Sequence, residues 1–246
     1  MSHIPVLRIG QCGTSGLDSS GRAPIETDSW DPSGYDYGIV ASAAKVITFV
    51  PAQLQANNVV ASAVINGAAT LAAGTGVTST TLNGVTVLDI TGGAYERAIQ
   101  IVGASGVSQV AFTVVGYDAY GQPVTCTFNG PSGAATTVST KTFRYIYSIT
   151  SAATTTNAVT IGTADTYGFP ARVGSFDQCL IFWNSALITA TTGFTAADDT
   201  TATASTGNVR GKYAAQSASD GTKRMRMIVW LDSPNNMDTA YGVKQA

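Results

Sequence analysis

The chain has 246 residues, with 13 Lys and Arg against 15 Asp and Glu, and a formal net charge of −2. Charged side chains make up 11% of it, where an ordinary globular protein carries roughly 25%. The near-neutral balance argues against nucleic acid as a partner, and a hydrophobic fraction of 44% argues against a disordered chain. Because a surface with little charge favours association, the composition suits a protein that works in an assembly.

The N-terminal segment and the cysteines bear on where the protein is made. Residues 1–8 hold no apolar core of signal-peptide length, and no apolar stretch approaches the roughly 18 residues that a membrane span needs. Cys12, Cys126 and Cys179 are odd in number and far apart, which favours buried thiols over a disulfide scaffold. We therefore expect assembly inside a cell and no membrane partner.

Residues 1–38 are punctuated by Gly and Pro, and no apolar period in them persists. We expect an extended arm, which with a first strand or helix makes up residues 1–59. Trp30, Tyr35 and Tyr37 are candidate inter-subunit contacts, because aromatic anchors concentrate binding energy. The alternative is that the arm packs back on its own domain.

The segment from Ile39 to Ala63 leaves helix and strand open. It is the best helical candidate in the chain, although Pro51 would break such a helix. Val46–Val50 is equally typical of a strand, because it is rich in β-branched and aromatic residues.

Residues 60–165 predict an antiparallel β-sandwich core, Ig-like or jelly-roll-like, of seven or eight strands. Short alternating runs recur at roughly ten-residue spacing, which is typical of a sandwich. A hairpin is expected across 110–128, with its turn at Asp118–Gln122. Three Asn-Gly dipeptides are further hairpin signals, at 66–67, 83–84 and 129–130.

Residues 166–246 predict extra C-terminal strands, which either complete the sandwich or form a second small β module. Phe176–Trp183 is the most apolar run of the chain, and residues 195–208 are a polar loop of low complexity. The basic cluster Lys223, Arg224 and Arg226 alternates with Met225 and Met227, which indicates a strand with one polar face.

Candidate catalytic groups are few. His3 is the single histidine and lies near the N-terminus, so a Ser/His/Asp triad or a histidine zinc site has little support, and no phosphate loop occurs. A glycosidase needs two carboxylates, and the available acids are Asp28, Asp31, Asp118, Asp165, Asp177, Asp198 and Asp199. Asp is also the favoured turn residue, and Asp118 and Asp165 are at positions where hairpin turns are expected. We expect no enzyme, no cofactor and no metal site.

Six tyrosines of the β region could form a sugar-stacking platform. Tyr145 and Tyr147 share a predicted face with Phe143, an arrangement that is more often core or interface than ligand site.

One set of motifs is similar to a known class. The hairpin 116–125 contains G-x-D-x-Y-G and is followed by Asn129-Gly130-Pro131, while 207–213 reads GNVRGKY and 219–224 reads SDGTKR. These motifs resemble β-rich virion structural proteins of tailed bacteriophages. The resemblance implies a capsid decoration or cement protein, located in the virion and assembled in the cytoplasm of a host bacterium.

What the resemblance implies about partners follows from that role. A decoration protein bridges and stabilises subunits of the phage major capsid protein and associates with itself, most naturally as a homotrimer. Two alternatives remain open, a tail or head-to-tail connector component and a carbohydrate-binding β module.

Overall fold

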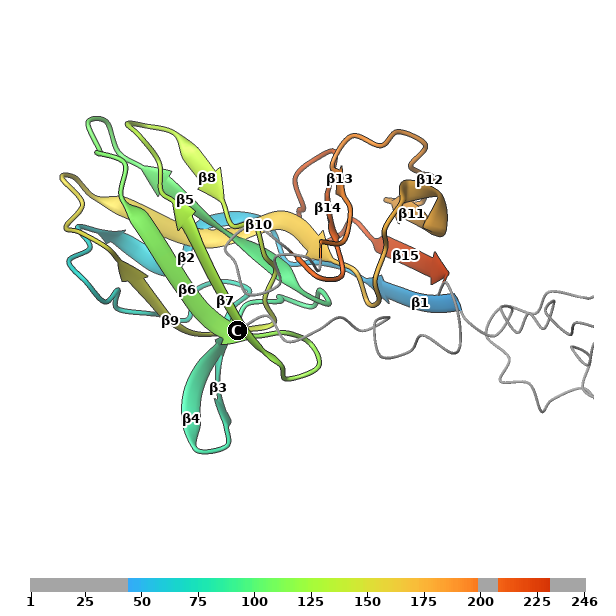
Figure 1. Cartoon of the computed structure of the whole chain (residues 1–246), viewed down its shortest axis with the longest axis horizontal. Coiled ribbons are helices and arrows are strands. Elements are labelled where there is room, and N and C mark those ends of the chain that lie inside the picture. The colour runs from blue at the N-terminus through green and yellow to red at the C-terminus, as the bar shows by residue number, and fades with distance from the viewer. Residues whose placement is uncertain (1–43, 199–207, 231–246) are drawn as a thin grey trace, which may run out of the picture.

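The computed structural model describes residues 44–198 and 208–230, which form an all-β protein of antiparallel sheets (Figure 1). The strands are β1 (Ala44–Phe49), β2 (Gln55–Ala63), β3 (Thr78–Leu82), β4 (Val85–Asp89), β5 (Arg97–Gly103), β6 (Ala111–Tyr117), β7 (Pro123–Asn129), β8 (Thr136–Val138), β9 (Tyr145–Ser151), β10 (Val159–Gly168), β11 (Cys179–Trp183), β12 (Ala186–Leu187), β13 (Phe194–Thr195), β14 (Lys212–Ala214) and β15 (Met225–Trp230). One turn of 3-10 helix, η2 (Phe176–Gln178), precedes β11. The predicted antiparallel sandwich with extra C-terminal strands is confirmed, and the expected arm over 1–43 lies outside the described residues.

Residues 55–163 form the larger body, which we call the sandwich lobe. One sheet has the order β3-β4-β9-β6-β7, and facing it lie β2, β5, β8 and the first part of β10. Both sheets contribute to one aliphatic core, which includes Val59, Ile101, Phe112, Ile149 and Ile161, all 2% exposed or less. The predicted hairpin is confirmed, since β6 and β7 pair from Ala111↔Asn129 to Tyr117↔Pro123 around the turn at 118–122.

The second lobe contains residues 44–49, 164–198 and 208–230. Its four-stranded sheet, sheet A, has the order β1-β15-β11-β12 and packs against β13, β14 and the end of β10. Its core is aromatic and sulfur-rich, with Tyr167, Trp183, Tyr213, Met225 and Met227 all 5% exposed or less. The predicted basic strand is confirmed, because in β15 Met225 and Met227 are buried while Arg226 is exposed.

Strand β10 belongs to both lobes (Figure 1). Its first residues pair with β5 and β2 in the sandwich lobe, and Thr166–Gly168 pair with β14 in the second. Between Thr163 and Tyr167 the register with β5 shifts by two residues, so the strand carries a bulge where it passes from one lobe to the other. The expected division at 165/166 lies within this strand.

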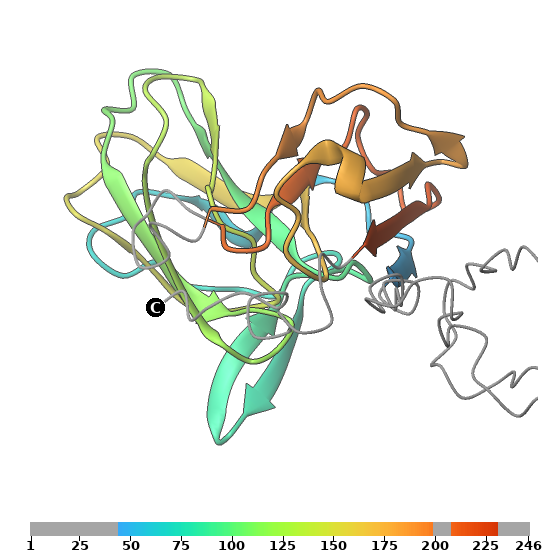
Figure 2. The same cartoon turned by 45° about the vertical axis from the view of Figure 1, so that its right-hand side comes forward.

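The hairpin of β3 and β4 projects from the sandwich lobe (Figure 2). Its two-residue turn is Asn83-Gly84, and both residues have positive φ, 49° and 82°. Asn and Gly adopt this conformation at low cost, so the dipeptide signal is confirmed here. The other two Asn-Gly dipeptides do not connect paired strands: 66–67 follows β2, and 129–130 closes β7 against Val110.

Two expectations fail for identifiable reasons. A helix over 39–63 is wrong within the described residues, because β1 and β2 occupy 44–49 and 55–63, and Pro51 lies between them. Tyr147 is not core, since its side chain is 51% exposed. Val115 pairs with Ser148 but Gly116 pairs with Ile146, so Tyr147 is the extra residue of a bulge and strict alternation does not hold through it.

Candidate functional site

The junction between the lobes contains a cluster of buried charged groups, which we call the Arg210 site. Arg210, 1% exposed, precedes β14 and donates from Nη1 to Asp118 Oδ2 at 2.7 Å and from Nη2 to Glu96 Oε1. Glu96 lies just before β5, and Asp118 begins the β6–β7 turn. The guanidinium of the second lobe is therefore clamped by two carboxylates of the sandwich lobe, and its Nε also donates to the Phe169 carbonyl.

The remaining oxygen atoms of the two carboxylates are also satisfied. Glu96 accepts the Ala119 N–H and the Thr142 hydroxyl, both at 2.8 Å. Asp118 Oδ1 accepts the N–H groups of Tyr120 and Gln122, each at 2.8 Å. Both side chains are 1% exposed or less. A substrate has no access to this pair, so the geometry is that of a structural clamp.

Burial sets the electrostatics of the Arg210 site. Two acids share one guanidinium at a buried position, and charged groups lose much of their solvation there. Burial raises the pKa of Glu96 above its ordinary value, although Arg210 and the Ala119 N–H oppose that rise. Burial lowers the pKa of Arg210, but Glu96 and Asp118 together outweigh it, so this pKa lies above its ordinary value. The arginine therefore stays charged, while burial disfavours the ionised form of Glu96.

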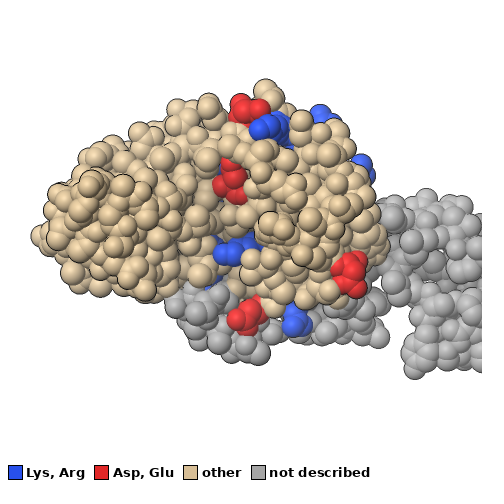
Figure 3. Space-filling view, turned by 90° about the horizontal axis from the view of Figure 1, so that it is seen from above, with Lys and Arg blue, Asp and Glu red and all other residues tan. Residues whose placement is uncertain are grey.

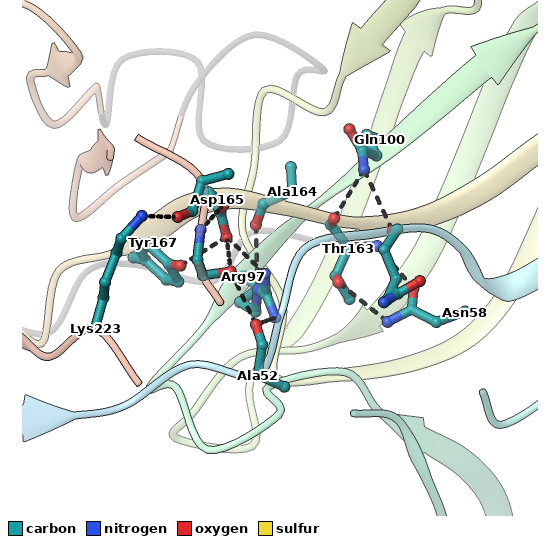
Figure 4. A network of polar contacts seen from close by, with 12 residues as sticks. Ala52, Asn58, Arg97, Gln100, Thr163, Ala164, Asp165, Tyr167 and Lys223 are labelled. Carbon is teal, nitrogen blue, oxygen red and sulfur yellow. Dashed lines mark hydrogen bonds and ion pairs between the residues drawn. The ribbon is translucent and has the colours of Figure 1, made fainter. Parts of the chain in front are cut away.

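A second cluster, the Arg97 site, lies where β10 bulges (Figure 4). Arg97, fully buried, donates from Nη2 to Asp165 Oδ1 at 2.8 Å, from Nε to the Ala164 carbonyl and from Nη1 to the Ala52 carbonyl. Asp165 also accepts the Tyr167 hydroxyl and the Ser219 N–H at 2.8 and 2.7 Å. This single ion pair thus joins β5, β10, the β1–β2 link and the loop before β15.

Other polar contacts cross the junction beside these two sites. Lys212 of β14 donates to the carbonyl groups of Ser139 and Thr140, at 3.1 and 2.7 Å. Tyr120, in the β6–β7 turn, donates its hydroxyl proton to the Pro170 carbonyl, and Lys45 of β1 lies 2.5 Å from the same hydroxyl. The two lobes therefore form one body held by charge-assisted contacts as well as by the shared strand.

Inside the sandwich lobe a neutral polar cluster fixes β2 on β10 (Figure 4). Asn58 accepts the Thr163 N–H at 3.0 Å and donates to the Thr163 hydroxyl, while Gln100 donates to the Thr163 carbonyl. Gly162 lies next to this cluster, and a Cβ there would lie 2.0 Å from the Gln55 carbonyl oxygen. The close approach of the two backbones requires glycine at this position.

The surface of the sandwich lobe carries no fully exposed charge. Four charged side chains of residues 55–163 are buried and two are half-buried: Glu96, Arg97, Asp118, Lys141, and then Asp89 and Arg144. The face of this lobe that Figure 3 shows is tan, whereas the blue and red residues lie at the junction and over the second lobe. Its exposed strand positions are occupied mainly by Thr, Ser, Ala and Val.

The projecting hairpin has edges available for pairing. Among the described residues β3 pairs only with β4, and β4 pairs with β9 only at Leu88 and Asp89. Residues 78–87 contain no charged side chain and no proline, the two devices that usually protect a sheet edge. A groove of about 310 Å³ lies at the base of the hairpin, lined by Leu71, Ala73, Ser79, Thr86, Val87, Leu88, Ile146 and Tyr147.

The residues singled out from the sequence have varied positions. The candidate inter-subunit contacts Trp30, Tyr35 and Tyr37 lie outside the described residues. Asp118 is in a turn as predicted, but the same prediction for Asp165 is wrong, because Asp165 lies inside β10. The tyrosines form no platform: Tyr167 is core, and Tyr147 is the only tyrosine among the groove-lining residues.

The motifs that resemble phage virion proteins converge in space. The 116–125 hairpin supplies Asp118 and Tyr120, the 207–213 stretch supplies Arg210 and Lys212, and the 219–224 stretch supplies Ser219. Sequence reasoning missed Glu96 and Arg97, the first of which is one of only two glutamates. An adjacent charged pair that opens an apolar strand was the available signal, because such charges are buried only when they are paired.

Comparison with models of known protein families, with curated proteins and with solved structures finds no match. Within residues 44–198 and 208–230, no group of three or more His, Cys, Asp or Glu is placed to hold a metal ion. The same residues contain no helix that is long and apolar enough to cross a membrane. Cys126 and Cys179 are buried, as expected, and burial raises the pKa of Cys179 to about 12.

Proposed function

We propose that this chain is a non-enzymatic structural protein of a tailed-phage virion, a capsid decoration protein that bridges coat subunits. The observation that carries this proposal is the surface of the sandwich lobe, where residues 55–163 expose no charged side chain fully. Free soluble proteins keep charges on their surfaces, because these oppose non-specific association. A surface of hydroxyl and small apolar groups suits a protein whose working state is bound to a neighbour.

The projecting hairpin gives this surface a defined means of contact. An uncharged five-residue edge such as β3 is a template for strand addition by another chain. Backbone hydrogen bonds then supply affinity, and the half-buried and exposed side chains beside the edge, such as Leu82 and Val85, supply specificity. We infer that the hairpin and the adjoining face of the sandwich lobe contact the phage major capsid protein.

The buried charges support a mechanical role. Three buried ion pairs hold the two lobes together: Arg210 with Glu96, Arg210 with Asp118, and Arg97 with Asp165. Buried networks of this kind cost solvation energy and are useful where a unique, stiff arrangement matters. A bridge between coat subunits requires such stiffness, because a body that bends between two contacts transmits no restraint.

The first test is the copy number of the chain in purified particles. Its peptides are quantified by mass spectrometry against those of the major coat protein. A ratio near one per coat subunit, or a simple fraction such as one trimer per local three-fold, is the expected result. Roughly a dozen copies or fewer would instead place the chain in a tail or connector ring. Absence from the particle would overturn the virion assignment.

A pair of variants then tests the surface itself. Thr78→Lys combined with Thr81→Lys puts one charge on each face of the edge strand β3, at two exposed positions. Thr189→Lys adds a charge to an exposed loop of the second lobe as the control. We expect the β3 variant to lose at least tenfold in occupancy on stripped particles at an unchanged melting temperature. Equal binding by both variants would exclude the hairpin as the coat contact.

A carbohydrate-binding module is the second candidate, and the groove under the hairpin favours it. Tyr147 is 51% exposed there and lies beside Ser79 and Thr86, which combines a stacking face with hydroxyl groups. Glycan-array binding that Tyr147→Ala abolishes would support this function. If the intact protein binds no glycan on the array, the carbohydrate-binding function is excluded and the groove is assigned to the contact with the coat.

A further inference from the structure

Sheet A exposes an apolar face. In the antiparallel register Val46 pairs with Ile228 and Ile228 pairs with Leu180, so these three side chains form one row across the sheet, with Ile228 only 9% exposed between its two exposed neighbours. The opposite face, with Met225, Met227 and Ile181, is buried in the core of the second lobe. In a sheet with one solvated side, the outward row is expected to be polar, and here it is apolar.

The outward face is apolar beyond that row. Val46, Leu180 and Leu187 are 42%, 37% and 47% exposed, and Phe182 beside them is half-buried. The one charge on the face is Arg226, whose guanidinium lies 6.0 Å from the centre of the Phe182 ring. Exposed apolar side chains gathered on one face mark an interaction surface, unlike single ones scattered over a protein.

Both ends of the described chain meet at one corner of this sheet. Ala44 and Trp230 are register partners, so residues 1–43 and 231–246 continue from neighbouring points. Extended, the 43 residues of the N-terminal segment reach up to roughly 140 Å, enough to cross to an adjacent molecule.

The N-terminal segment has the composition to cover such a face. Residues 26–37 contain three large aromatics, four acids and no Lys or Arg: Trp30, Tyr35 and Tyr37, with Glu26, Asp28, Asp31 and Asp36. The aromatics match the apolar row, and the acids match Arg226 and the adjacent exposed Arg224. No other twelve-residue stretch outside the described residues combines aromatic and acidic residues in this way.

We propose that the outward face of sheet A is the docking surface for residues 26–37 of a second copy of this chain. Each copy then donates one segment and offers one face, and repetition of that contact closes a symmetric oligomer. The inference rests on the proposed function, which requires self-association, and it names the two surfaces that make the contact.

Photo-crosslinking of the full chain tests the proposal. Two versions are co-expressed: one carries a benzophenone amino acid in place of Leu187 and Thr27→Ser as a mass tag, and the other has neither change. Trypsin releases residues 23–45 as one peptide, since Arg22 and Lys45 flank it. The expected cross-link joins position 187 to the untagged peptide, which only a second copy can supply.

Every other outcome overturns the proposal. Cross-links to the tagged peptide alone would show that the segment covers its own face, and cross-links elsewhere, or none, would exclude the segment altogether. Benzophenone in place of Val64, 53% exposed on the sandwich lobe, is the control and should not capture this peptide.

A second measurement is independent of the probe. Val46→Lys with Leu180→Lys should raise the dissociation constant of the oligomer at least tenfold in sedimentation runs, while Val64→Lys leaves it unchanged. If the chain is present at a coat-like copy number but shows neither the cross-link nor the weakened oligomer, this inference is wrong and the proposed function still stands. A chain absent from the particle contradicts the proposed function instead.

Discussion

The two lobes of this protein differ in the residues that form their cores and in the charge on their surfaces. The sandwich lobe is one continuous stretch, 55–163, with a core dominated by Val and Ile. The second lobe is assembled from separate segments around aromatic rings and methionines, and several of its strands have only two or three residues. Charge divides them as well, since Asp177, Arg224 and Arg226 are exposed on the second lobe while the sandwich lobe exposes no charged side chain fully.

This difference indicates how each lobe is stabilised. The sandwich lobe contains two hairpins, β3–β4 and β6–β7, whose pairing closes short loops, and its other strands pair over longer stretches of the same continuous segment. The second lobe pairs β1 with β15, which brings Ala44 against Trp230 across most of the chain. We therefore expect the second lobe to depend on the junction, where Arg210 and Arg97 fix it to the completed sandwich.

Removal of Arg210 should have the largest destabilising effect on the protein, because it detaches the second lobe from the sandwich lobe. Arg210→Met leaves Glu96 and Asp118 buried without their cation, which we expect to cost about 3–5 kcal/mol in the free energy of unfolding. Urea titration at neutral pH measures the loss. Asp177→Asn, which removes an exposed charge of the second lobe, is the control and should change stability by no more than about 0.5 kcal/mol. Equal losses for the two variants would contradict the junction as the stabilising feature.

Gly162→Ala should follow in size, and it acts within the sandwich lobe. The added methyl group would lie 2.0 Å from the Gln55 carbonyl oxygen, so β2 must move away from β10. We expect a loss of about 1–3 kcal/mol, typical of overpacking. Gly174→Ala in the second lobe is the control, because its nearest neighbour would be the Gln178 side chain at 3.5 Å. A loss in the control as large as in Gly162→Ala would point to glycine content rather than to the close strand contact.

The two lobes also differ in how far the sequence predicts them. In the sandwich lobe, the alternation in 110–128 gives strands, faces and the 118–122 turn correctly, because each signal is local. The failures are local irregularities that no periodicity contains: the extra residue Tyr147 reverses the predicted face of β9, and Asp165 lies in a bulged strand that continues into the other lobe.

The junction could be predicted only in part. Asp118 was recognised as a turn residue, and it does accept two backbone N–H groups of its own turn. Its partner Arg210 lies 92 residues away, and no pattern along one chain links such positions. Glu96 and Arg97 were missed for the same reason. The buried charges owe their positions to the packing of complete lobes, which follows from tertiary structure and not from spacing.

The buried Glu96 of the junction should make the stability of the protein depend on pH. Since burial raises the pKa of Glu96, the folded protein holds this proton more tightly than the unfolded chain does. The free energy of unfolding should therefore fall as pH rises from about 4.5 toward the folded pKa, and level off above it. Glu96→Gln should flatten this fall. Asp177→Asn, which removes an exposed carboxylate of the second lobe, is the control and should leave the fall in place.

The smallest expected effect concerns the uncharged surface of the sandwich lobe. Thr113 and Thr127 are cross-strand partners of β6 and β7, and their hydroxyl groups lie 2.9 Å apart. Such a pair contributes roughly 0.2–1 kcal/mol, so Thr113→Ala, Thr127→Ala and the double variant should close a double-mutant cycle with a coupling below about 1 kcal/mol. Thermal unfolding of the four proteins measures it. A larger coupling would mean that the threonine surface serves the stability of the lobe itself. A small coupling would mean that the threonine hydroxyl groups add little to the stability of the lobe. Contact with a neighbouring subunit would then explain why this face carries hydroxyl groups in place of charges.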